Sequence, residues 1–352
     1  MTTKLYHLSH TDLDGYSCQL ISCNFFSDYK FFNANYGLEV KLSLEKIIDF
    51  ICNDPQEQPI LFLITDLNLT IDEAKSIDTQ INQLNQNGHN ITLQLLDHHA
   101  TGAKVSKQYG WYHLDTTKSA TLITYEYFKH NYSNFRDHFD DRFDKYIQAV
   151  NAVDIWLEDD PLFEFGKVCM TLISKSHEIN SILFPDISRN YRFALLRDSM
   201  GFLEQKDCHI ALDEALYHLK KKHLCLDATN DTIDNLISKY LVHTLENLKE
   251  SMTVHYKEYK GLLTYSLGSI SISANGFLKA NPDYHFFVDI SKRGKASFRA
   301  NNKIDVANLA QKLAGGGGHR NASGAAFKDF EETIIYDDVK KYFQNKLDKL
   351  NC

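Results

Sequence analysis

Several features that would place this chain in a specialised class are scarce or missing. The 352 residues include only five prolines, so no proline-rich linker is expected. The longest strongly apolar stretch, Ile60–Ile64, is far shorter than the ~20 residues that span a bilayer. The N-terminal residues Met-Thr-Thr-Lys-Leu-Tyr-His lack the apolar region of a signal peptide. We therefore expect no membrane association and no export signal.

Paired cysteines and a positive net charge are missing as well. The seven cysteines are odd in number and none has C-x-x-C spacing, which argues against a disulfide framework or a structural zinc ribbon. Such cysteines are typical of a reducing compartment, so we expect the cytoplasm. The net charge of −8 argues against a protein that coats long duplex nucleic acid by charge alone.

The composition is that of an ordinary globular protein, with 43% hydrophobic and 24% charged residues. The length predicts two domains with a connecting segment. Charge is unevenly spread, because residues 286–328 carry a net charge of +6 and the remainder −14. An acidic body with one basic segment suits a protein that holds metal ions in one place and phosphates in another. A solvated basic face is the alternative interpretation.

The first part of the chain, residues 1–160, alternates short apolar runs with helical patterns. Residues 4–9, 60–65 and 91–96 are predicted strands. Residues 70–86 are predicted to form a helix that Thr70 or Asp72 caps, and Asn87-Gly88 closes it. Strand–helix–strand order with continuous apolar strands predicts a parallel α/β sheet.

The remaining residues divide into a helical connector at 161–254 and a second, smaller α/β domain at 255–352. The connector has leucine and isoleucine at helical spacing. The last part returns to strand-like patterns, with predicted strands at 262–265, 269–274, 285–290 and 296–300. One short helix is predicted at 306–314, with Asp305 as its N-cap and glycines at its end.

The first chemical signal is His10-Thr-Asp12-Leu-Asp14-Gly15, directly after the first predicted strand. Ligands gather outside the carboxyl ends of the strands of a parallel sheet. Two carboxylates and an imidazole so close together suit a divalent cation such as Mn²⁺, Mg²⁺ or Fe²⁺. A polar turn whose aspartate caps the next helix is the plainer alternative.

Two further signals follow predicted strands, and one lies on a predicted helix. Asp66 comes directly after residues 60–65, and Asp97-His98-His99 ends the strand at 91–96. Asp97 is placed to accept the second ring N–H of a histidine and so orient it. Asp154 lies in a largely apolar helical run, where a carboxylate must be paired, bound to metal or exposed. Taken singly, each of these residues has a plainer reading as a turn, cap or surface residue.

The fifth signal is Gly315-Gly316-Gly317-Gly318-His319-Arg320, within the basic segment that also contains Arg299. Consecutive glycines can expose backbone N–H groups that cradle an anion, so the pattern favours phosphate binding. A flexible linker is the alternative.

The ordered set H-x-D-x-D-G, strand-end Asp, D-H-H, helical Asp and G-G-G-G-H-x-x-A-x-G resembles the DHH/DHHA1 phosphoesterase superfamily. The resemblance spans His10 to Gly324, and the phrase His-Thr-Asp-Leu-Asp-Gly is most similar to the bacterial nanoRNases of the B type. Ser323 departs from the alanine that is common there, a small change that we expect to be tolerated.

The resemblance implies a DHH domain followed by a DHHA1 domain, with two divalent ions, Mn²⁺ first and Mg²⁺ or Fe²⁺ as alternatives. It implies that His10, Asp12 and Asp66 hold one ion, and that Asp14, Asp66, His98 and Asp154 hold the other. His99, oriented by Asp97, would face the scissile phosphate. Arg299, Gly316, Gly317, Gly318 and His319 would bind the far end of the substrate.

The implied activity is hydrolysis of short oligoribonucleotides to mononucleotides by water that the two ions activate. Hydrolysis of cyclic or linear dinucleotides, or of 3′-phosphoadenosine 5′-phosphate, is an alternative that sequence does not separate from it. A non-enzymatic nucleotide sensor on a decayed phosphoesterase scaffold is a second alternative, but it predicts lost ligands. A manganese pyrophosphatase would lack the glycine loop, and an exonuclease of the RecJ type would need a further strand-gripping module. A homodimer is left open.

Overall fold

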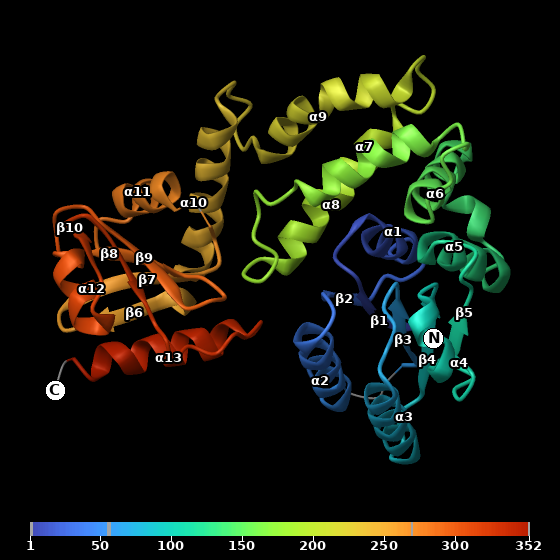
Figure 1. The fold of residues 1–352 in the computed structure, drawn as a ribbon, viewed down its shortest axis with the longest axis horizontal. Coiled ribbons are helices and arrows are strands. Elements are labelled where there is room, and N and C mark those ends of the chain that lie inside the picture. Colours follow the sequence, from blue (N-terminus) through green and yellow to red (C-terminus); the bar gives the residue numbers. More distant parts are fainter. Residues whose placement is uncertain (1–2, 55–57, 269, 351–352) are drawn as a thin grey trace. The chain divides into compact units, whose positions relative to one another are not determined.

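The computed structural model describes residues 3–54, 58–268 and 270–350, and it divides into two compact units (Figure 1). The first unit comprises residues 1–176 and 189–219, and the second comprises 177–188 and 220–352. The stretch 161–254, expected as a connector, is thus shared between the two units.

The first unit is built on a five-stranded, fully parallel sheet with the order β2-β1-β3-β4-β5. Its strands are β1 (Lys4–Ser9), β2 (Tyr29–Asn33), β3 (Ile60–Thr65), β4 (Ile91–Asp97) and β5 (Tyr112–Leu114). The expected parallel α/β sheet is therefore confirmed, and the predicted strands at 4–9, 60–65 and 91–96 are its three central strands.

Helices cover both faces of this sheet, so its strands are buried on both sides. Alternate residues of the central strands pack with α2 (Leu38–Cys52), α3 (Ile71–Gln86) and α4 (Ala103–Ser106) in one core. The opposite face carries α1 (Leu13–Ser22) and α5 (Ala120–Asn131). Helices α6 (Asp141–Asp154) and α7 (Phe163–Ser174) pack beyond them.

Hydrogen bonds at the N-terminus of α3 explain why the sequence predicted the start of this helix correctly. The Thr70 side chain accepts a hydrogen bond from the Glu73 backbone N–H, and the Glu73 carboxylate accepts one from the Thr70 N–H. This capping box satisfies two donors that a helix start leaves free. The helix predicted for 70–86 is confirmed, with Thr70 as its cap.

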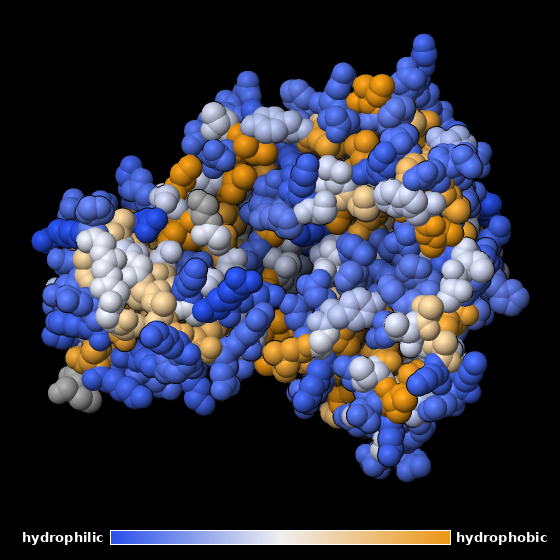
Figure 2. Space-filling model, viewed as in Figure 1, coloured by the Kyte–Doolittle hydropathy of each residue, from blue (hydrophilic) through white to orange (hydrophobic). Residues whose placement is uncertain are grey.

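The helices of the 161–254 stretch include α8 (Pro185–Met200), α9 (Cys208–Leu224) and α10 (Ile233–Met252). No helix of the described residues is both long and apolar enough to cross a membrane. Hydrophilic residues cover most of the face shown in Figure 2, and hydrophobic residues lie there in small groups.

The second unit holds a six-stranded sheet with the order β10-β11-β9-β8-β7-β6. Its strands are β6 (Thr253–Tyr256), β7 (Tyr259–Tyr265), β8 (Phe286–Ile290), β9 (Lys295–Ala300), β10 (Gly317–His319) and β11 (Ala322–Ala326). Only β7 and β8 pair in parallel. One face packs with α12 (Val306–Ala314) and α13 (Tyr336–Asp348) around a core that includes Phe286, Phe298 and Phe343.

The strand predicted at 269–274 is wrong. Residues 271–280 form helix α11 (Ser271–Ala280), and Ser269 lies outside the described residues. Short polar–apolar alternation suggested a strand, but Ala274, Phe277 and Leu278 are buried at helical spacing while Ile272 is half exposed. The helix predicted at 306–314 is confirmed, with Asp305 accepting from the Ala307 and Asn308 amides.

Candidate metal centre

The candidate ligands meet at one edge of the first sheet. His10 and Asp12 lie between β1 and α1, and Asp14 lies in the first turn of α1. Asp66 directly follows β3, and Asp97 ends β4 just before His98 and His99. Because these strands are parallel neighbours, their carboxyl ends lie at the same edge. Asp154, the last residue of α6, joins them from the helical layer.

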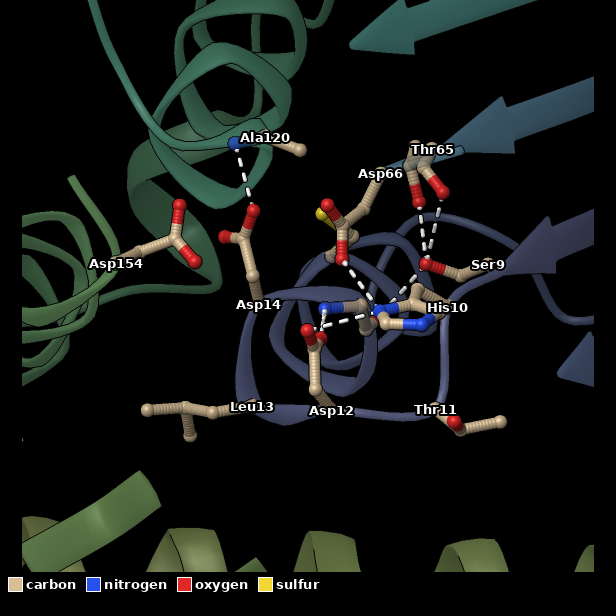
Figure 3. A network of polar contacts seen from close by, with 12 residues as sticks. Ser9, His10, Thr11, Asp12, Leu13, Asp14, Thr65, Asp66, Ala120 and Asp154 are labelled. Carbon is tan, nitrogen blue, oxygen red and sulfur yellow. Dashed lines mark hydrogen bonds and ion pairs between the residues drawn. The ribbon is translucent and has the colours of Figure 1, made fainter. Parts of the chain in front are cut away.

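The first group of donors is His10, Asp12 and Asp66, drawn in Figure 3. The Nδ1 atom of His10 lies 2.8 Å from Asp12 Oδ2 and 3.7 Å from Asp66 Oδ2. Asp12 also caps α1, because its Oδ1 accepts from the Gly15 N–H at 3.0 Å. Burial acts to raise the pKa of Asp12, but the His10 ring and the Gly15 amide outweigh it and hold the pKa at about 2. Asp12 is therefore ionised and ready to bind a cation.

The second group of donors is Asp14, His98 and Asp154. The Nε2 atom of His98 lies 3.8 Å from Asp14 Oδ2 and 3.5 Å from Asp154 Oδ2. It also lies 3.4 Å from Asp66 Oδ1. Donors bound at about 2.1 Å around an octahedral ion are separated by about 3.0–4.2 Å, so these spacings fit a shared cation better than direct hydrogen bonds.

Asp66 connects the two groups. Its Oδ2 faces His10 and its Oδ1 faces His98, so one carboxylate offers an oxygen to each group. The side chain is buried, and its backbone has a φ of 56°, in the left-handed region that a non-glycine residue seldom adopts. Burial and the neighbouring Asp14 and Asp12 charges raise the pKa of Asp66 well above its usual range. This cost is understandable if a cation normally compensates the charge.

Unpartnered oxygens provide a test of whether the residues fit metal ions. Asp66 Oδ2 and Asp154 Oδ2 are buried and have no hydrogen-bond partner among the residues that the structure describes. A buried carboxylate oxygen without a donor is unfavourable unless it binds a cation. The donor set of carboxylates and imidazoles also suits hard or borderline divalent ions. The residues therefore fit a pair of such ions, with His10, Asp12 and Asp66 around one, and Asp14, Asp66, His98 and Asp154 around the other.

Asp14 has a structural role besides. Its Oδ2 accepts from the Ala120 N–H and its Oδ1 from the Thr121 N–H, each at 2.8 Å (Figure 3 shows the first). These are the first amides of α5, where the helix dipole favours a negative charge. Burial nevertheless raises the pKa of Asp14. The carboxylate thus anchors a helix and faces the donor group at once.

Asp97 and His99 are arranged as the sequence suggested. The His99 Nδ1 lies 2.7 Å from Asp97 Oδ1, and the other Asp97 oxygen accepts from the Tyr112 hydroxyl. Asp97 is fully buried, while His99 is partly exposed beside Asp66. Burial alone would lower the pKa of His99, but the hydrogen bond to Asp97 and its charge raise it. The ring is held with its Nε2 left for another partner.

Sequence reasoning missed Tyr36, whose ring lies against two site histidines. Its centroid is 5.4 Å from that of His10 and 5.7 Å from that of His99. The signal was absent because nothing in the sequence marks the loop after β2 as part of the site. The buried side chains of His7, Ser9 and Thr65 were missed as well, and they form a hydrogen-bonded chain beneath the loop.

Trp156 is a further feature beside the centre. It lies two residues after Asp154, is 58% exposed and has a φ of 59°. Its indole N–H donates to Glu158 Oε1 at 2.7 Å, and its ring meets Phe163 edge to face.

The candidate phosphate-binding residues lie in the second unit. Arg299 on β9 is opposite Ala322 on β11, which is opposite His319 on β10. Residues opposite one another project from the same face, so Arg299 and His319 share a face about 10 Å apart. The Arg299 guanidinium donates to the Phe298 carbonyl and to Ser271 Oγ, at 2.8 and 3.0 Å, beside the start of α11.

The glycine run is not the open anion cradle that the sequence led us to expect. Gly315 ends α12 with a φ of 64°, and the amides of Gly315 and Gly316 bond to helix carbonyls of Gln311 and Ala310. Gly317 and Gly318 belong to β10, which pairs with β11. The amides of Gly315 and Gly316 therefore bond to the end of the helix, and Gly317 and Gly318 form an edge strand.

Comparisons with known proteins identify relatives of the chain. Residues 264–349 match the model of the DHHA1 domain. The chain is 40% identical over 341 residues, 97% of its length, to the 3′,5′-cyclic-nucleotide phosphodiesterase of Helicobacter pylori, and covers 98% of that protein. It also resembles the crystal structure of an uncharacterized protein from Helicobacter pylori G27, with 39% identity, a TM-score of 0.93 and 99% coverage of each chain.

Similarity of this extent covers both units and includes the matched C-terminal domain. The chain therefore belongs to the DHH/DHHA1 phosphoesterase superfamily and is a hydrolase that acts on phosphoester bonds.

Proposed function

We propose that the protein is a metal-dependent phosphodiesterase that hydrolyses short oligoribonucleotides to mononucleotides. The proposal rests on the Asp66 carboxylate, which offers one oxygen to the donor group around His10 and the other oxygen to the donor group around His98. A shared carboxylate is the usual design of a site for two divalent ions, and we propose Mn²⁺ as their identity.

The ions, when bound, would supply an activated water and neutralise charge on the phosphoryl oxygens. The protein's own residues would do the rest. Asp97 accepts from His99 Nδ1 and fixes the ring, so His99 Nε2 faces the substrate side. A raised pKa lets His99 keep a second proton, which Nε2 can give to the departing oxygen.

The second unit would supply contacts to the rest of the substrate. Arg299 is a fixed guanidinium, held by the Phe298 carbonyl and Ser271, and His319 shares its face of the sheet. Arginine suits phosphate because its donors form a planar fork. We propose that Arg299 and His319, with the edge of β10 at Gly317 and Gly318, bind a phosphate or sugar away from the scissile bond. Because the Gly316 amide bonds to the Ala310 carbonyl, Gly316 would act through the backbone shape alone.

A second candidate substrate comes from the relative in Helicobacter pylori, whose name states that it acts on 3′,5′-cyclic nucleotides. At 40% identity over nearly the whole chain, this activity is a direct competitor. A cyclic nucleotide has a single phosphodiester and no distal phosphate. Arg299→Ala should therefore raise KM for RNA more than for a cyclic nucleotide.

A substrate panel tests the proposal. Purified protein with Mn²⁺ is given labelled RNA of 2, 5 and 24 nucleotides, 3′,5′-cyclic AMP, cyclic di-AMP, 3′-phosphoadenosine 5′-phosphate and pyrophosphate, and rates are ranked. We expect the 2-mer and 5-mer to be cleaved fastest. A higher kcat/KM for 3′,5′-cyclic AMP would replace our proposal with the cyclic nucleotide activity. No hydrolysis of any compound would favour the sensor.

A further inference from the structure

Hydrogen bonds connect the segment before Tyr36 to the segment that carries His10 and Asp12. The Ala34 N–H donates to the Ser9 carbonyl at 3.0 Å, and Asn33 Nδ2 donates to the His10 carbonyl at 3.1 Å. Thr11 Oγ1 donates to Asn35 Oδ1 at 2.6 Å. Three successive residues before Tyr36 thus bond to three successive residues of the metal-binding loop, which places Tyr36 beside the donors.

The same loop is also braced from behind. The backbone N–H and the side-chain amide of Asn35 both donate to Glu39 Oε2, at 2.9 and 3.1 Å. Gly37 follows Tyr36 with a φ of 84°, which permits the sharp turn into α2. A side chain held on both sides in this way is positioned before any ligand arrives.

The Tyr36 ring lies at the rim of the centre. It meets His99 edge to face at an interplanar angle of 79° and packs at 47° against His10. The residue is nonetheless 44% exposed, so one side rests on the imidazoles and the other is open to solvent. Exposure alone does not set Tyr36 apart, since Tyr29 is 43% exposed, but Tyr36 combines it with contact to two histidines of the candidate centre.

Few groups around the ring can donate a hydrogen bond to a phosphoryl oxygen, and the proposed function assigns the His99 Nε2 proton to the departing oxygen. Carboxylates accept hydrogen bonds only, and a histidine bound to an ion has lost a donor. The Nδ1 proton of His99 is already engaged by Asp97. A tyrosine hydroxyl is a neutral hydrogen-bond donor that matches a negatively charged phosphoryl oxygen.

We propose that Tyr36 is a substrate-contact residue whose hydroxyl donates a hydrogen bond to a phosphoryl oxygen of the bound phosphodiester. The inference rests on the proposed function for the identity of the substrate, but not for the anion contact itself. It assigns recognition of the phosphate to the loop after β2 as well as to the metal ions.

Three variants test this assignment. Tyr36→Phe removes only the hydroxyl, Tyr36→Leu removes the ring contacts as well, and Tyr29→Phe is the matched control. Tyr29 is similarly exposed, at 43%, but stacks on Phe31 instead of the site histidines. A hydrogen bond to a charged group corresponds to about a 10–100-fold effect. We expect Tyr36→Phe to lower kcat/KM for the RNA 2-mer by that factor and Tyr29→Phe to leave it unchanged.

Two binding measurements separate this role from the alternatives. Calorimetry should show that Tyr36→Phe binds Mn²⁺ like the parent protein, whereas the Mn²⁺-loaded variant binds inorganic phosphate about tenfold or more weakly. A loss of Mn²⁺ affinity would show that Tyr36 acts through the ions, and would overturn the assignment. The assignment would also be overturned if Tyr36→Phe matched the parent in kcat/KM while Tyr36→Leu was impaired, because the ring and not the hydroxyl would then matter.

The phosphate measurement also keeps the two proposals apart. If the parent protein hydrolyses no phosphodiester, the proposed function fails, but weaker phosphate binding by Tyr36→Phe would still support the contact. If the parent is active and Tyr36→Phe is unchanged in kcat/KM and in phosphate affinity, the inference fails alone.

Discussion

The six candidate ligands differ in what they do besides facing an ion. Asp14 holds the first two amides of α5, so replacing it disturbs a helix as well as the centre. Asp154 has no such partner, and its Oδ2 lacks a hydrogen bond altogether. Burial and the charges of Asp14 and Asp12 raise the pKa of Asp154 to about 9. Asp154 is therefore the better position at which to test metal dependence.

We expect Asp154→Asn to abolish Mn²⁺-dependent hydrolysis while stabilising the metal-free protein. The folded-state pKa lies above the unfolded value, so between about pH 4 and about pH 9 the unfolded chain loses this proton while the folded protein keeps it, and stability falls as pH rises. The amide removes this cost, by on the order of 1–3 kcal/mol near pH 7. Urea unfolding in the presence of a chelator measures this change in stability. Asp213→Asn, at an exposed position of α9, is the control. A less stable Asp154→Asn protein would contradict the charge argument.

The pairing of Asp97 with His99 makes a separate prediction. Asp97→Asn removes the charge that raises the pKa of His99, so the ring should titrate at lower pH in the variant. The stabilising interaction is present below the ordinary histidine pKa of about 6.5 and is lost as pH rises through the raised value. NMR of the ring protons in metal-free protein measures this shift, and kcat should fall about 10–100-fold. An unchanged titration would mean that Asp97 does not set the ring's charge.

The sequence alone identified residues that a local pattern marks, either at the end of an apolar strand or in a distinctive motif. His10, Asp66 and His98 follow apolar runs that are easily recognised, and parallel pairing then brings them together. Tyr36 has no such mark. Its place depends on β2 pairing beside β1, and Tyr29-Lys-Phe-Phe-Asn is too short and too exposed to be recognised as a strand.

At the scale of elements, the four glycines are the instructive case. Their composition suggested one phosphate-binding loop, with a flexible linker as the alternative. The structure instead places Gly315 and Gly316 at the end of α12 and Gly317 and Gly318 in β10. A Cβ on Gly316 would lie 2.2 Å from the Gly324 carbonyl oxygen, and one on Gly318 would lie 2.6 Å from that of Ala322. Gly317 has open space instead. Long-range strand pairing decides these roles, and a local sequence pattern does not contain it.

Alanine substitutions should separate these roles. Gly316→Ala and Gly318→Ala force backbone movement, and we expect each to destabilise the protein by about 2 kcal/mol or more. Gly317→Ala meets no atom within 4 Å, and we expect its effect to stay within about 1 kcal/mol. Denaturant unfolding of the three variants gives the comparison. Equal destabilisation by all three would mean that the hairpin is not packed as described.

Ser323, which pairs with Gly318 in the β10–β11 hairpin, is a departure from the family pattern that the hairpin accommodates. Its hydroxyl donates to the Val306 carbonyl at 2.7 Å, so the added polar group is satisfied although it is buried. The strand predicted at 269–274 was wrong for a similar reason, because a local pattern does not show which residues become buried. The helical spacing of the buried residues Ala274, Phe277 and Leu278 is what distinguishes a helix from a strand there.

At the scale of the whole molecule, the candidate site residues are divided between the two units. The donor residues from His10 to Asp154 all belong to the first, and Arg299 with the β10–β11 hairpin belongs to the second. The fold class followed from strand and helix order, but the division did not. Residues 177–188 and 189–219 belong to different units, and only tertiary packing assigns them.

This division predicts a local effect of metal. Mn²⁺ binds the folded first unit in preference to the unfolded chain and should stabilise it by mass action. Hydrogen exchange should slow in peptides from residues 10–15, 66–70 and 97–102, and stay unchanged in peptides from 259–265 and 286–290 of the second unit. Chelator should reverse the change. Equal protection of both sets would contradict metal binding confined to the first unit.

Asp14 also explains how several like charges can stay gathered in one small volume. Repulsion among Asp12, Asp14, Asp66 and Asp154 would tend to scatter them, yet the amide end of α5 serves Asp14 as a permanent counter-charge. We therefore expect the donor side chains to keep their arrangement when cations leave, so that a new ion would meet a site that is already formed.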